Sequence, residues 1–235
     1  MEDLVNEIKS TAHWRVNIRP TKFKKEKIGR LSDIKEVMEK CIVNLRGWPY
    51  PYFTREEISN GIDYVEGKCD WKGIKEYWRF YQSAQFIHHF SLFENSERGR
   101  IAIAHSAEPI GSKKDLKGSL SIFSTLFKMT EIYEFSIRLA QKGIFEKGVY
   151  ISIILRGIRN HRLIFFGNER FTFAPYISNI DEIPLESTLG VEELITKGHD
   201  RAIKDTIFLF ERFNWDSPPI GILKEQQKKL LERRL

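Results

Sequence analysis

Aromatic rings lie beside basic side chains most densely between residues 48 and 93. Two runs carry the pattern, Trp48-Pro-Tyr-Pro-Tyr-Phe53 and Tyr77-Trp-Arg-Phe-Tyr81. Flat rings stack on nucleic-acid bases, and neighbouring cations neutralise phosphates. The sequence therefore predicts a nucleic-acid-binding site, to which a lysine-rich stretch nearer the N-terminus adds charge. Its candidate residues are Lys24, Lys25, Lys27, Trp48, Tyr50, Tyr52, Arg79 and Tyr81.

The same rings allow two other interpretations. Trp48 and the rings from residue 77 to 81 can fill a protein core, because Trp and Tyr bury large apolar areas. If the rings are exposed but no positive groove lies beside them, the better interpretation is a subunit of a larger complex that binds another protein through this surface. A nucleic-acid-binding or regulatory protein is the first prediction, because the charge balance and the aromatic loops both point to it.

A second pattern is Glu66-Gly-Lys68, which matches the acid-x-Lys half of a common nuclease motif and has Asp63 nearby. Carboxylates would bind Mg²⁺, and the lysine would steady the attacking water or the developing charge. The alternative prediction is therefore a metal-dependent nuclease with Asp63, Glu66 and Lys68 as catalytic residues and Mg as cofactor. In a chain that is 30% charged the motif also arises by chance, as solvent-facing charges. The first prediction requires no cofactor or metal.

Two further groups of residues could carry chemistry. His88 and His89 could supply a general base, but adjacent side chains point to opposite faces of a strand and rarely act on one atom. Glu131, Glu134 and Arg138 are spaced to share one stripe of an apolar helix. Charges on a central helix pair internally or line a pocket, and internal pairing is the preferred interpretation here.

Composition is typical of a soluble globular chain with a basic surface. The 235 residues are 41% hydrophobic, enough to bury a core, and we expect a single domain spanning residues 1–235. With 38 basic against 32 acidic residues, the formal net charge is +6. A positive balance favours acidic partners such as nucleic acid, while a protein partner or a homo-oligomer stays open.

Cysteine content and hydropathy bear on location. Cys41 and Cys69 are the only cysteines, too few for a disulfide framework, and they have no zinc-ligand spacing. The first residues are acidic rather than a hydrophobic leader, and no apolar run approaches 18 residues. These features predict a cytoplasmic protein without membrane association.

Hydrophobic periodicity predicts the first half of the chain as follows. Residues 13–19 alternate as a half-buried strand, and residues 31–45 form an amphipathic helix. The segment 74–93 fits either periodicity, and helix is favoured for its first half. Residues 119–142 are apolar around most of a helical circumference, which is typical of a central helix.

Strand and helix signals alternate in the second half. Residues 148–156 and 161–166 read as two strands of a hairpin, followed by a short strand at 170–174. The remaining expected elements are a loop over 95–117, a loop over 175–190 and a basic helix over 221–235. Residues 191–213 have helical periodicity that Gly198 interrupts, and either two helices or one kinked helix fits them. The predicted fold class is α+β, with a mostly antiparallel sheet packed on the central apolar helix and with C-terminal helices.

Overall fold

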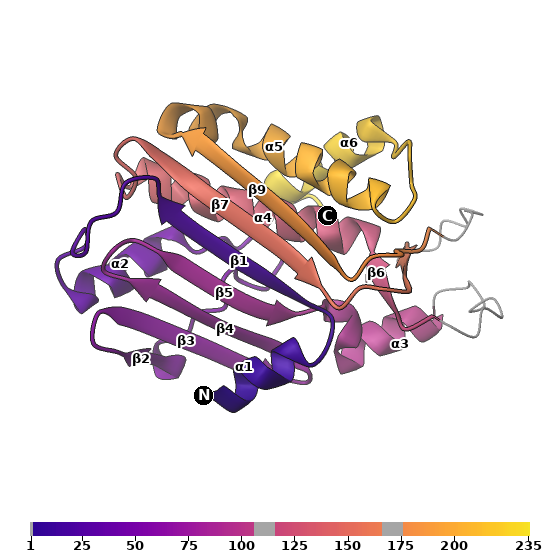
Figure 1. The fold of residues 1–235 in the computed structure, drawn as a ribbon, viewed down its shortest axis with the longest axis horizontal. Coiled ribbons are helices and arrows are strands. Elements are labelled where there is room, and N and C mark those ends of the chain that lie inside the picture. Colours follow the sequence, from indigo (N-terminus) through magenta and orange to yellow (C-terminus); the bar gives the residue numbers. More distant parts are fainter. Residues whose placement is uncertain (1, 106–115, 166–175) are drawn as a thin grey trace.

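The computed structural model describes residues 2–105, 116–165 and 176–235, and within them seven strands form one antiparallel sheet (Figure 1). A second, two-stranded sheet pairs β6 (Gly118–Ser121) and β8 (His161–Ile164) in parallel. The strands of the main sheet are, in spatial order, β2 (Ile58–Asn60), β3 (Tyr64–Trp71), β4 (Ile74–Tyr81), β5 (Phe86–Ser91), β1 (His13–Pro20), β7 (Gly148–Arg156) and β9 (Glu182–Gly190).

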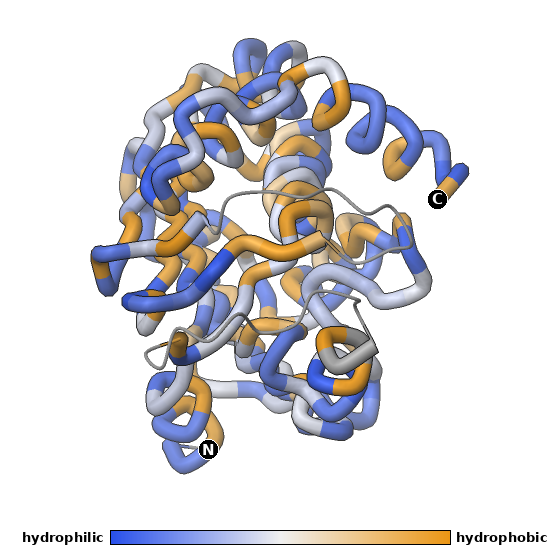
Figure 2. The backbone as a smooth tube through the Cα atoms, turned by 90° about the vertical axis from the view of Figure 1, so that its right-hand side faces the viewer, coloured by the Kyte–Doolittle hydropathy of each residue, from blue (hydrophilic) through white to orange (hydrophobic). Residues whose placement is uncertain are grey.

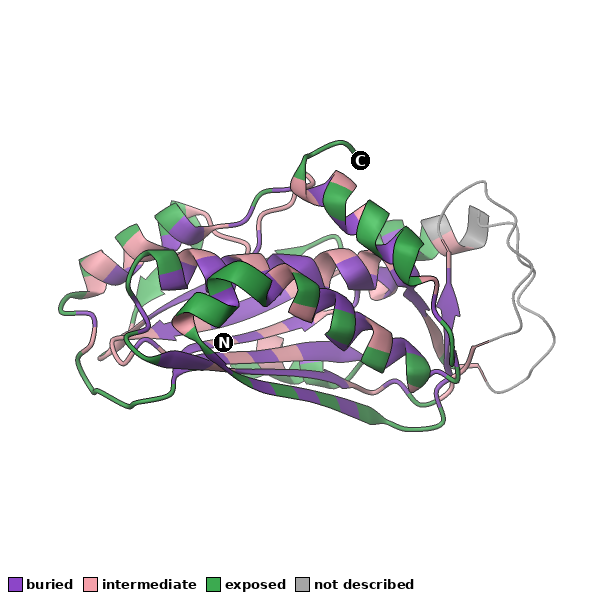
Figure 3. Cartoon of the chain, turned by 90° about the horizontal axis from the view of Figure 1, so that it is seen from above, coloured by how far each residue is buried: buried purple, intermediate pink, exposed green. Residues whose placement is uncertain are grey.

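Helices cover one face of the main sheet (Figure 3). The helix α4 (Ile122–Gln141) packs on the sheet, and α2 (Leu31–Cys41), α5 (Val191–Glu211) and α6 (Ile220–Leu231) pack against α4. On the other face α1 (Glu2–Lys9) contacts β4 and β5, and Glu7 pairs with Lys75. No helix in the described ranges combines the length and apolarity that crossing a bilayer requires. The arrangement confirms the α+β class.

The predicted central helix is confirmed as α4. Its first three predicted residues belong instead to β6, and the helix begins after Ser121, whose hydroxyl accepts a hydrogen bond of 3.3 Å from the Ser124 amide. It ends where Gly143 adopts a φ of +72°, a left-handed conformation that favours glycine. Most residues of α4 are buried, so the helix packs against the sheet in the interior of the molecule.

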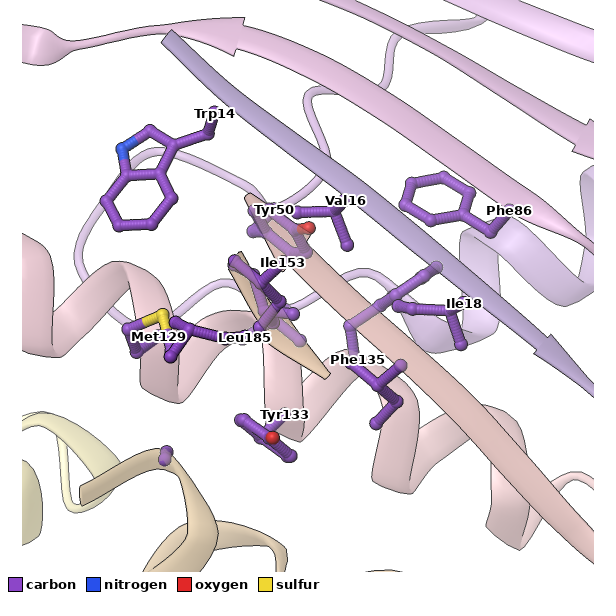
Figure 4. Packing of buried hydrophobic residues seen from close by; sticks show 14 of the residues in the cluster. Trp14, Val16, Ile18, Tyr50, Phe86, Met129, Tyr133, Phe135, Ile153 and Leu185 are labelled. Carbon is purple, nitrogen blue, oxygen red and sulfur yellow. The ribbon is translucent and has the colours of Figure 1, made fainter. Parts of the chain in front are cut away.

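Aromatic and aliphatic side chains of α4 and the sheet form the core (Figure 4). The Phe135 ring lies 4.9 Å from that of Phe86 and 5.9 Å from that of Tyr50, measured between centroids. Both Phe135 and Tyr50 are fully buried. Figure 2 shows the same arrangement in the backbone trace, since hydrophobic segments run through the middle of the molecule while its C-terminal end is mostly hydrophilic.

The helix favoured for the first half of residues 74–93 is wrong, because this segment forms the β4–β5 hairpin. Glu76, Trp78 and Phe80 alternate inward with period two, and Ala84 turns the chain with a φ of +63°. Partners on both sides, β3 and β5, select the strand. Tertiary pairing therefore decides a segment whose local pattern is ambiguous.

The hairpin predicted for residues 148–166 is also wrong. The strand β7 pairs with β1 and β9, while β8 pairs with β6. Residues 182–190, predicted as loop, form the edge strand β9, where Pro184 is tolerated because the open edge does not need its amide. The predicted strand at 170–174 lies outside the described residues.

Two helices differ from the sequence prediction. Residues 97–105 form α3 (Glu97–His105) within the segment predicted as a loop. The helix α5 continues through Gly198 without interruption. A Cβ atom at that position would lie 2.9 Å from Ile137 Cδ1, so the glycine allows α5 to approach α4 closely.

Candidate ligand-binding site

A cavity of about 480 Å³ opens between the sheet and the start of α4. Strands β1, β4 and β5, the loop after α2, and α3 also contribute to its wall. The volume falls in the range of about 300–1,000 Å³ that is typical of small-ligand pockets. Its lining combines aromatic rings, cations, carboxyl groups and hydroxyls. We call this cavity, together with the residues that line it, the tryptophan pocket.

Rings form the apolar part of the tryptophan pocket. Trp48 stacks on Trp71 with 5.8 Å between ring centroids, and Trp14 stacks on Phe90 at 6.2 Å. Trp48 also stacks on Tyr52 at 4.9 Å. The Trp71 side is open to solvent, with 39% of that residue exposed.

Glu76 holds the aromatic loop in place. Its carboxylate accepts hydrogen bonds from Trp48 Nε1 at 2.8 Å and from the Tyr52 amide at 3.2 Å. His88 Nε2 lies 3.2 Å from its second oxygen, and burial lowers the pKa of His88. Burial alone would raise the pKa of Glu76, but His88, Lys128 and Trp48 outweigh it and lower the pKa to about 2. The carboxylate is therefore ionised, and its hydrogen bonds hold Trp48 and the backbone at Tyr52.

Glu94 is the second buried carboxyl group and has the opposite character. It lies on the short 3-10 helix η2 (Phe93–Asn95), with 4% of the residue exposed, and it lines the cavity. The donors that reach it are backbone amides, including that of Ser121 at 2.6 Å from Oε1. No cation forms an ion pair with it in the part of the chain that the structure describes. Burial raises the pKa of Glu94 to about 7.

Three cations surround these carboxyl groups. Arg46 donates from Nε and Nη2 to Glu131 at 2.7 and 3.1 Å, and Lys128 Nζ lies 3.2 Å from the same carboxylate. Glu131 thus shares its single charge between two cations. Arg98 lies over the Trp71 ring at 4.8 Å, and among the described residues it has no ion pair. Arg98 is therefore the cation of this lining that no described carboxylate pairs with.

A hydroxyl group completes the pocket. Thr125 is 2% exposed, lines the cavity, and its Oγ1 has no hydrogen-bond partner within the described residues. Buried polar groups are nearly always hydrogen-bonded. Thr125 therefore offers an unsatisfied hydroxyl to any ligand that enters.

The predicted nucleic-acid-binding residues do not form one surface. Trp48 lines the cavity and Tyr52 packs against it, whereas Tyr50 is fully buried and its ring is covered. Strand alternation places Arg79 and Tyr81 on the opposite face of the sheet from Glu76. Lys24 and Lys25 are exposed in the loop after β1, and Lys27 pairs with Glu146 at 2.7 Å.

The residues of the nuclease alternative are partly brought together. Glu66 accepts hydrogen bonds from Tyr77 at 2.5 Å and from Arg79 at 2.9 Å, and it lines a smaller cavity of about 250 Å³ together with Lys68. Asp63 is not part of that cavity. Within the described ranges no group of three His, Cys, Asp or Glu side chains is arranged to hold a metal ion.

Sequence reasoning identifies only Trp48 of the tryptophan pocket. Glu76 could have been found, since an acidic residue in phase with Trp78 and Phe80 faces the buried side of a strand. No local signal marks Glu94 or Arg46. No known family model matches the chain, and comparisons with curated proteins and solved structures find no significant match. Function is therefore inferred from the geometry of the cavity.

Glu94 should make the protein less stable as the pH rises. The folded chain keeps the carboxyl proton up to a pKa of about 7, whereas the ordinary value is 4.5. Unfolding therefore releases a proton in this window, and stability falls through it and levels off above. Relative to the unaltered chain, Glu94→Gln should gain up to about 3 kcal/mol of unfolding free energy between about pH 4.5 and 8. Urea unfolding at several pH values measures the difference in unfolding free energy between the variant and the unaltered chain. If the effect of the substitution were purely steric, this difference would not change with pH.

Proposed function

We propose that the tryptophan pocket binds a nucleotide, either free or as an unpaired nucleotide of a nucleic-acid strand. The observation that carries the proposal is the convergence of stacked tryptophans and three cations around one cavity. A nucleotide combines a flat ring with an anionic group, which are the two features that this lining complements. We further propose a cytoplasmic location, which two free cysteines favour.

The rings account for the base. Trp48 is held by its hydrogen bond to Glu76, so its plane is fixed before a ligand arrives. A preorganised ring loses little conformational freedom on binding. Stacking of a base on an aromatic side chain contributes about 1–3 kcal/mol and tolerates any base.

The cations account for the phosphate. Arg46 uses Nε and Nη2 on Glu131, which leaves Nη1 for another acceptor. Arg98 is exposed and held only over the Trp71 ring among the described residues. Charge-assisted hydrogen bonds from guanidinium groups suit phosphate oxygens well. The unsatisfied Thr125 hydroxyl can donate to the same group.

Nucleotide addition should quench the intrinsic fluorescence of the protein, because three of its five tryptophans line the cavity. We expect Trp48→Ala to weaken binding by about 1–3 kcal/mol through lost stacking. Arg98→Ala should also weaken binding and reduce its dependence on salt. The titration uses mononucleotides in one arm and short single-stranded oligonucleotides in the other, which distinguishes the two sources of the ligand.

Arg100→Ala is the matched control. Arg100 lies on α3 two residues after Arg98 and is exposed, but it does not line the cavity. The control should bind mononucleotides as the unaltered chain does. Equal affinities of all three variants, or no quenching by any nucleotide at millimolar concentration, would remove the proposal and leave the protein-interaction interpretation as the better account.

A further inference from the structure

Glu94 has the properties of a side chain that distinguishes between ligands. It is 4% exposed, lines the tryptophan pocket, and is reached by backbone amides without any ion pair in the described part of the chain. A carboxylate has about four lone-pair positions, of which the backbone amides of Ser121 and of Glu94 itself use two. Acceptor capacity therefore remains on a carboxyl group that is itself buried at the wall of the pocket.

The other carboxyl group of the pocket cannot play this part. Glu76 already accepts from Trp48 and from the Tyr52 amide, and His88 adjoins its second oxygen. Its contacts position the loop rather than a ligand. The pocket therefore contains two different carboxyl groups. Glu76 holds the loop, and Glu94 can accept hydrogen bonds from a ligand.

We infer that Glu94 selects the base of the bound nucleotide and that the preferred base is guanine. This inference rests on the proposed function. An ionised carboxylate only accepts hydrogen bonds. On its pairing edge, guanine presents N1–H and N2–H₂ side by side, two donors that match two carboxylate oxygens. Adenine and cytosine place a ring acceptor beside their amino group, and uracil flanks its one donor with two acceptors.

Charges around Glu94 agree with this assignment. Arg46 from the loop after α2 and Lys128 from α4 are both engaged by Glu131. Arg98 from α3 lies over Trp71, and Glu76 of β4 adds a negative charge to the same lining. Two backbone amides and the nearby charge of Arg46 act on Glu94. Its remaining acceptor positions are those that the two N–H groups of guanine would fill.

Affinities for three monophosphates test the inference on the unaltered full-length chain. The ligands are guanosine, inosine and adenosine 5′-monophosphate, of which inosine retains N1–H but lacks the 2-amino group. We expect guanosine to bind about 10- to 100-fold more tightly than adenosine, with inosine between them, as a bidentate contact discriminates. Calorimetry or tryptophan quenching measures all three.

Glu94→Gln supplies the second measurement. The amide keeps the shape of the side chain but replaces one acceptor by a donor. The variant should lose the preference for guanosine, because the glutamine amide offers one acceptor and one donor, which match the amino group and the ring acceptor of adenine instead. Circular dichroism checks its folding, and the comparison of the three ligands on the unaltered chain does not depend on the variant.

The pH dependence gives an independent readout. The ionised form of Glu94 accepts from guanine, so the ratio of guanosine to adenosine affinity should rise up to about tenfold between pH 6 and 8. Taking the ratio cancels the titration of the phosphate. Glu94→Gln should show no such rise.

The outcomes separate this inference from the proposed function. Equal affinities for the three monophosphates, with Trp48→Ala weakening all of them, would overturn the role of Glu94 and leave nucleotide binding in place. A preference for guanosine that survives in Glu94→Gln would also overturn it. Failure of every nucleotide to bind would remove both.

Discussion

Replacing Phe135 by alanine should lower the free energy of unfolding by about 3–5 kcal/mol. The ring is fully buried between those of Phe86 and Tyr50, on the face of α4 that packs on the sheet. Its removal loses transfer free energy and leaves a cavity that a rigid aromatic cluster cannot close. Urea or thermal unfolding of the full chain measures the loss.

Phe127→Ala is the control for this prediction. Phe127 lies on the same helix and undergoes the same chemical change, but it is only partly buried, where it stacks on Phe123 at 6.3 Å. We expect it to cost about 1–2 kcal/mol. A loss at Phe135 no larger than the loss at Phe127 would show that α4 does not pack as described.

Glu131→Ala should cost about 3–5 kcal/mol of unfolding free energy. The carboxylate is buried and neutralises Arg46 and Lys128, whose side chains are only 24% and 16% exposed. Removing the shared acid leaves two partly buried cations close to each other and without the carboxylate that pairs with both. Their repulsion and lost solvation destabilise the folded chain more than the lost ion pairs alone.

Glu36→Ala provides the comparison for a surface acid. Glu36 forms an i, i+4 pair with Lys40, and both side chains are more than half exposed. Such a pair contributes little, so the change should stay within about 0.5 kcal/mol. Denaturant unfolding of both variants at one pH makes the comparison, and similar losses at the two positions would contradict a buried ion-pair network.

Elements with a strong local pattern were predictable from the sequence. The strand at residues 13–19 and the helices predicted within residues 31–45 and 119–142 follow from periodicity, because one face of each repeats its apolar residues at the spacing of its structure. Segments that fit both the helical and the strand periodicity could not be predicted from the sequence. Residues 74–81 become a strand because β3 and β5 flank them and satisfy their backbone groups, and no local window contains that information.

The candidate site divides in the same way. Trp48 was predicted as a ligand-contacting ring because aromatic and basic residues lie close together around it in the sequence, and it lines the cavity. Arg79 and Tyr81 were grouped with it because they are near in sequence, but strand alternation turns them to the other face of the sheet. Glu94 reaches the cavity because η2 follows β5 directly and packs against β6, two elements whose adjacency no spacing rule indicates.

By itself the sequence determined the fold class, the apolar helix at the centre, and the types of side chain available for binding. Only the tertiary structure decided which of these side chains meet and how each titrates. Periodicity acts over neighbouring residues, whereas the tryptophan pocket joins residues more than one hundred positions apart. The pKa of about 7 at Glu94 and the pKa of about 2 at Glu76 differ because burial dominates at one carboxyl and donors and cations at the other, and this difference exists only after folding.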